Sequence, residues 1–117
     1  MASGKVKSDF KAQGVLLGEE STITADGTAI TFSSIQDKNF IVVACLLGSN
    51  PNWIATSIAP ISLILGTNVW LQAIAYENSS NIISGTFKLT SYTSGMIRLV
   101  ASSGWTGMPK KIAVYAC

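Results

Sequence analysis

Histidine, the side chain most often used as a general base, proton shuttle or metal ligand, is absent from the 117 residues. A Ser-His-Asp or Cys-His catalytic arrangement therefore cannot be assembled. The two cysteines, Cys45 and Cys117, form no Cys-x-x-Cys pair, so a thiolate zinc site is not expected. A buried thiol at Cys45, within an apolar run, and a loose terminal thiol are the favoured interpretation, with a disulfide between them as the alternative.

The acidic residues are too scattered to predict hydrolytic or calcium-binding chemistry. Glu19 and Glu20 are adjacent, whereas Asp26, Asp37 and Glu77 stand apart. A glycosidase needs two carboxyl groups facing each other across a cleft, and a calcium loop needs closely spaced aspartates. No glycine-rich stretch ends in the Gly-Lys-Ser/Thr of a phosphate-binding loop. The sequence therefore predicts a protein that is not an enzyme and holds no metal or cofactor.

Aromatic residues beside amides are the remaining side chains suited to binding a ligand. Trp53 and Trp105 are expected in loops, where an exposed indole can stack on a sugar ring while neighbouring amides bind its hydroxyls. The alternative is that each of them plugs one end of the fold. Trp70 lies within an apolar run, which favours packing in the core. The candidate ligand contacts are Trp53, Trp105, Tyr92, Asn50, Asn52 and Asn81.

Short runs of β-branched and aromatic residues, separated by Gly, Asn, Ser and Pro, predict the elements that would carry these side chains. A hairpin is expected over 21–32, with a type I′ turn at Asp26-Gly27 and with Ile23 and Ile30 facing one core. The run 40–47 is apolar throughout, which is typical of a central strand covered on both faces. Outside the hairpin, strands are expected near 10–17, 39–47, 53–58, 61–65, 69–76, 82–91, 96–102 and 111–116.

These strands predict an all-β fold, an antiparallel, jelly-roll-like β-sandwich of about eight to ten short strands. One domain over 10–117 is expected, after a flexible N-terminal segment over 1–9. That segment lacks the apolar stretch of a secretory signal, and the most apolar stretch, 53–65, is too short to cross a bilayer as a helix. We therefore expect synthesis in the cytoplasm and no membrane insertion.

Charge is scarce in this chain. Hydrophobic residues make up 48% of it and charged residues 12%, and Glu77 is the only charged side chain between Asn39 and Phe87. A single small β-fold cannot hide so many apolar side chains, so a homo-oligomer with an extensive interface is expected. The net charge of +2 comes from scattered residues, which argues against nucleic acid as a partner.

A tryptophan loop followed by a last apolar strand ends the sequence, as Gly104-Trp105-Thr106-Gly107 and Lys111-Ile112-Ala113-Val114-Tyr115-Ala116. This order resembles the end of C-terminal tip domains in bacteriophage tail-fibre and receptor-binding proteins, although Ala116 stands where glycine is common in them. The resemblance implies a homotrimer of jelly-roll-like sandwiches in the virion tail. Such a trimer would contact other virion proteins and bind a carbohydrate or protein on the host surface.

Three functional hypotheses follow from these observations. The first is a non-enzymatic phage or prophage structural and receptor-binding module for host attachment. The second is a purely architectural capsid or tail subunit that binds only other structural proteins. The third is a soluble β-sandwich lectin.

Overall fold

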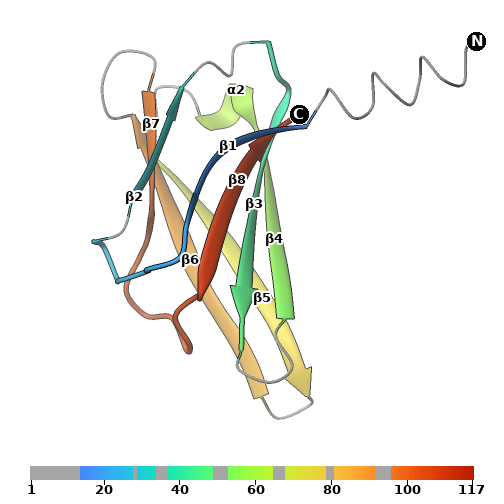
Figure 1. Ribbon diagram of the computed structural model, residues 1–117, viewed down its shortest axis with the longest axis vertical. Helices are drawn as coiled ribbons and strands as arrows, with labels where there is room; N and C mark the ends of the chain where they lie inside the picture. The colour runs from blue at the N-terminus through green and yellow to red at the C-terminus, as the bar shows by residue number, and fades with distance from the viewer. Residues whose placement is uncertain are drawn as a thin grey trace, which may run out of the picture.

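The protein is a sandwich of two antiparallel four-stranded sheets (Figure 1). The computed structural model describes residues 14–27, 29–33, 37–48, 53–64, 68–78, 81–91 and 96–117. Sheet A has the strand order β1 (Val15–Glu20), β8 (Lys111–Ala116), β3 (Phe40–Leu47) and β4 (Trp53–Pro60). Sheet B has the order β2 (Ala29–Ser33), β7 (Met96–Ala101), β6 (Asn81–Ser91) and β5 (Val69–Asn78).

The predicted all-β sandwich is confirmed, while the finer description as a jelly roll stays a prediction. The predicted flexible segment over 1–9 lies outside the described residues. Within the described part of the chain, no helix has the length and apolar character needed to span a bilayer.

Alternate residues of each strand point into one core between the sheets, as the period of a β-strand requires. Sheet A buries Ile41, Val43 and Leu47 from β3, and sheet B buries Phe87 and Leu89 from β6. Removing each of these side chains from water contributes roughly 1.5–3 kcal/mol. Both cysteines carry free thiols, Cys45 buried and Cys117 exposed, as the sequence favoured.

The predicted hairpin over 21–32 is wrong. β1 pairs with β8 and β2 pairs with β7, so the segment between β1 and β2 crosses from one sheet to the other. Asp26 does adopt a positive φ of 57°, but Gly27 does not, which excludes a type I′ turn. The Asp26 N–H donates instead to the carbonyl of Ala101, at 2.7 Å. An Asp-Gly turn with flanking isoleucines suits this crossing as well as it suits a hairpin.

A strand predicted over 61–65 is also wrong, because α2 (Ile61–Ile64) forms a single helical turn there. Pro60 ends β4, and the Ile61 N–H donates to the carbonyl of Asn39 at 2.9 Å. Ile61 and Ile64 are both buried, which is the i, i+3 spacing of a helical face. β1 begins at residue 15 rather than 10, and residues 10–13 are not described.

Trp70, predicted in the core, lies on the outer face of β5 with 57% of its surface exposed. The inward positions of the same strand hold Ala73 and Ala75. β5 is an edge strand, and its open edge lies against that of β4, where the Ser57 hydroxyl donates to the Gln72 carbonyl at 2.5 Å. At this approach the inward residues are small, whereas Val69 and Leu71, nearer the start of β5, are large and pack partly buried against the core.

Candidate functional site

An apolar surface covers the outer side of sheet A, and we call it the apolar face. Strand register places its residues in rows across β8, β3 and β4. Val42 pairs with both Tyr115 and Ile58, and Leu46 pairs with both Lys111 and Ile54. The apolar face consists of Leu16, Phe40, Val42, Ala44, Leu46, Ile54, Thr56, Ile58, Pro60, Ala113 and Tyr115.

The most exposed side chains of the apolar face lie on the edge strand β4. Ile54 is 71% exposed and Ile58 is 64% exposed, whereas the small residues between them, Ala55 and Ser57, point inward and are buried. Large apolar residues therefore face water and small ones face the core. Single exposed apolar residues are normal on protein surfaces, but a contiguous apolar patch marks an interaction surface.

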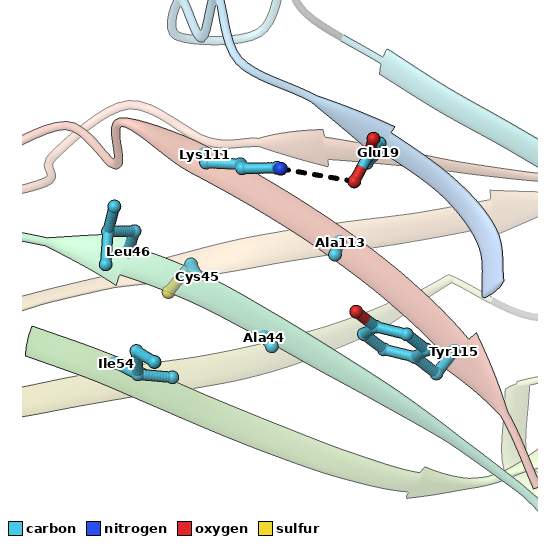
Figure 2. A pocket seen from close by; sticks show the side chains of 8 residues that line it. All are labelled: Glu19, Ala44, Cys45, Leu46, Ile54, Lys111, Ala113 and Tyr115. Carbon is cyan, nitrogen blue, oxygen red and sulfur yellow. Dashed lines mark ion pairs between the residues drawn. The ribbon is translucent and has the colours of Figure 1, made fainter. Parts of the chain in front are cut away.

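A shallow hollow of ≈ 220 Å³ lies within the apolar face. Ala44 and Ala113 are paired across β3 and β8, and the absence of larger side chains at these two positions creates the depression. Figure 2 shows the Tyr115 ring at one end of the hollow and Leu46 with Ile54 at the other. Its lining is suited to receiving an apolar side chain.

One ion pair stands at the margin of this hollow. The Lys111 ammonium lies 3.3 Å from a Glu19 carboxylate oxygen, and both side chains are about half exposed (Figure 2). Exposed pairs of this kind stabilise a fold by less than roughly 1 kcal/mol, so its main effect is to give the apolar face a polar border. Beneath the hollow, burial raises the pKa of the Cys45 thiol to about 11 and keeps it protonated and unreactive at neutral pH.

The described residues hold no group of three or more Cys, Asp or Glu side chains arranged to bind a metal ion. Comparisons with family models, with curated proteins and with solved structures found no match.

Trp105, predicted as a ligand contact, packs against strand β6 of its own chain. Its indole lies directly over Gly85 and forms a tilted pair with Phe87, with ring centroids 5.1 Å apart. Its Nε1–H donates to the Thr86 carbonyl at 3.1 Å, an oxygen that also accepts the Ser102 N–H at 3.0 Å. The loop after β7 is thus fastened along β6, which favours the alternative of a structural plug.

Trp53 is likewise turned toward the core, where its buried Nε1 has no hydrogen-bond partner among the described residues. Tyr92, Asn50 and Asn52 lie outside the described residues, and Asn81 begins β6 with a side chain that is not described. Of the six predicted contacts only Trp53 and Trp105 have described side chains, and both are turned into the fold, so the binding role of the six stays a prediction.

The apolar face was only partly foreseen. The run 40–47 predicted a strand covered on both faces, but within one chain only its inner face is covered. The remaining signal is the alternation of large and small residues over Ile54–Ala59. Period-two alternation predicts a strand but does not say which set faces the core.

Proposed function

We propose that this protein is a non-enzymatic assembly and binding module that forms a homo-oligomer through the apolar face. The observation that carries this proposal is the row of exposed isoleucines on β4 beside the hollow at Ala44 and Ala113. Protruding side chains and a depression on the same face suit a contact between copies, in which Ile54 or Ile58 of one copy fills the hollow of another.

A homotrimer at the tip of a phage tail fibre is the assembly that agrees with the sequence resemblance. In this proposal the outer strands of sheet A face the neighbouring copies, while sheet B and the loops face outward toward a carbohydrate or protein on the host surface. Repeating one weak site on three copies raises the overall affinity through effective concentration, so no single site needs to be strong.

The test of assembly is the molar mass in solution, measured by size-exclusion chromatography with light scattering at micromolar protomer concentrations. We expect a defined oligomer for the unmodified chain and a monomer for the double variant Ile54→Asp/Ile58→Asp. Ile74→Asp is the matched control, because Ile74 is an exposed isoleucine on the outer face of sheet B. A monomeric unmodified chain, or dissociation by Ile74→Asp alone, would overturn the proposal.

A purely architectural subunit is the second candidate, because the apolar face accounts for self-association without any outside ligand. Whole-cell binding separates the two candidates. A receptor-binding module should bind host cells, whereas an architectural subunit should only co-assemble with other structural proteins. Trp105→Ala is unsuited to this assay, since it would remove the packing over Gly85.

A further inference from the structure

The outer side of sheet B carries a second surface whose chemistry differs from that of the apolar face. Outward positions of β5 and β6 combine aromatic and aliphatic residues with polar ones. Cross-strand pairs join Trp70 to Lys88, Gln72 to Thr86, Ile74 to Ser84 and Tyr76 to Ile82. We call this surface the aromatic face, and it consists of Trp70, Gln72, Ile74, Tyr76, Ile82, Ser84, Thr86 and Lys88.

Two exposed aromatic rings stand at the ends of the aromatic face. Trp70 is 57% exposed and Tyr76 is 61% exposed, and they are six positions apart along the strand, or roughly 20 Å. The Gln72 amide and the Ser84 hydroxyl lie between the rings, beside the Thr86 hydroxyl, which is hydrogen-bonded to the Ser102 hydroxyl. Aromatic rings at the ends of a row of amides and hydroxyls match an extended oligosaccharide, whose sugar rings stack on aromatics and whose hydroxyls need hydrogen-bond partners.

Two cations, Lys88 and Arg98, are the charged residues of sheet B whose side chains the structure describes. The Lys88 ammonium lies 5.4 Å from the centre of the Trp70 ring, and Arg98 is a diagonal neighbour of Lys88 across β6 and β7. Neither cation forms an ion pair within the described part of the chain, and the side chain of Glu77, the one acidic residue of β5, is not described. Two neighbouring cations favour a negatively charged ligand.

We propose that the aromatic face binds an extended acidic oligosaccharide, with Trp70 and Tyr76 stacking on its sugar rings and with Lys88 and Arg98 pairing with its acidic groups. A second copy of this chain fits the face less well, because a two-fold contact would bring these cations against their own counterparts. The inference deepens the proposed function by naming a ligand class, and it relies on that function only in leaving sheet B outward in the oligomer.

The test is binding of the full chain to a printed array of acidic and neutral oligosaccharides of four or more units, followed by calorimetry on the acidic ones that bind. We expect binding to acidic members only. Trp70→Ala or Tyr76→Ala should weaken it about tenfold, and Lys88→Gln/Arg98→Gln should weaken it by a similar factor and flatten its dependence on salt. Leu63→Ala is the control, since Leu63 is an exposed apolar residue that belongs to neither face, and this substitution should leave the affinity unchanged.

Several results would overturn the inference: no acidic oligosaccharide bound, equal binding to neutral ones, or unchanged affinity in the Trp70 and Tyr76 variants. Each variant's far-ultraviolet circular dichroism checks folding, and the Lys88→Gln/Arg98→Gln pair keeps the test valid if Trp70→Ala does not fold. Light scattering on the same samples separates this test from that of the proposed function. A monomer that still binds refutes only the assembly, whereas dissociation by Trp70→Ala would assign the aromatic face to contact between copies and refute the oligosaccharide site.

Discussion

Gly85→Ala tests how strongly the loop after β7 is tied to the sheet. Gly85 lies in the middle of β6, and a Cβ built on it would fall among the ring atoms Cγ, Cδ2 and Cε2 of Trp105. An indole ring is rigid and the β6 backbone is held by β5 on one side, so the tryptophan must move as a whole. Its movement would break the bond to the Thr86 carbonyl and the packing on Phe87.

The expected loss follows from these two contacts and the associated burial. The hydrogen bond contributes about 1 kcal/mol, the aromatic pair about 1 kcal/mol, and partial exposure of the indole roughly another 1–2 kcal/mol. Replacing glycine by alanine in a strand also stabilises the fold by roughly 0.5–1 kcal/mol, because the unfolded chain loses conformational entropy. We therefore expect Gly85→Ala to lower the free energy of unfolding by about 2–3 kcal/mol.

Urea unfolding followed by far-ultraviolet circular dichroism, at one fixed protomer concentration, measures this loss. The decisive variant is Gly85→Ala in a Trp105→Ala background, where alanine has no ring to displace and should be neutral or slightly stabilising. Gly107→Ala is the matched control in the same loop, since its Cβ would meet Ile83 at an ordinary 3.5 Å. Additive effects of the two substitutions, or a loss below about 0.5 kcal/mol for Gly85→Ala alone, would refute the reasoning.

Three further predictions concern buried polar groups. The folded-state pKa of Cys45 is about 11 against an ordinary 9.0, so between pH 9 and 11 the unfolded chain ionises first. The free energy of unfolding should therefore fall by about 2–3 kcal/mol more than that of a Cys45→Ala variant between pH 9 and 11. Below pH 9 the free energies of the two proteins should change with pH in parallel. A thiol reagent at pH 8 should label Cys117 rapidly and Cys45 only on unfolding, as peptide mass spectrometry would show; equal rates would contradict the burial. Ser57→Ala removes the donor to the Gln72 carbonyl and should lower the free energy of unfolding in urea by about 1–2 kcal/mol. Thr56→Ala, at the exposed neighbouring position, should change it by less than about 0.5 kcal/mol. Equal effects would show that the hydrogen bond contributes nothing.

Strand positions could be predicted from the sequence because period-two alternation is a local property. Residues 40–47, 69–76, 82–91 and 111–116 all lie in strands, within one or two residues of the expected bounds. Strand partners are not local. Asp26-Gly27 permits a sharp change of direction, but whether the next strand returns to its neighbour or crosses to the other sheet depends on β7 and β8, far along the chain.

The short apolar run after Pro60 shows a second limit. An apolar run of four or five residues fits a strand or a helical turn equally well. Here the β3–β4 pairing ends at Phe40 and Pro60, and the run that follows forms a helical turn. The candidate site shows the same dependence on tertiary structure. Trp105 is a loop residue, as predicted, yet its indole packs against β6 in the space that a side chain at Gly85 would fill.

The two edge strands β4 and β5 carry the two different surfaces of this chain, in which charged residues are scarce. Where the two edges meet, near Ser57 and Gln72, the inward residues are small, as Ala55 and Ala73 are, whereas Trp53 and Leu71 of the same strands are large and pack against the core. On β4 the outward neighbours are apolar residues of β3, and the result is a continuous apolar face. On β5 they are hydroxyl-bearing residues and Lys88 of β6, and the result is the aromatic face. The chemistry of the adjacent strand therefore determines whether each surface suits another copy of the chain or a charged ligand.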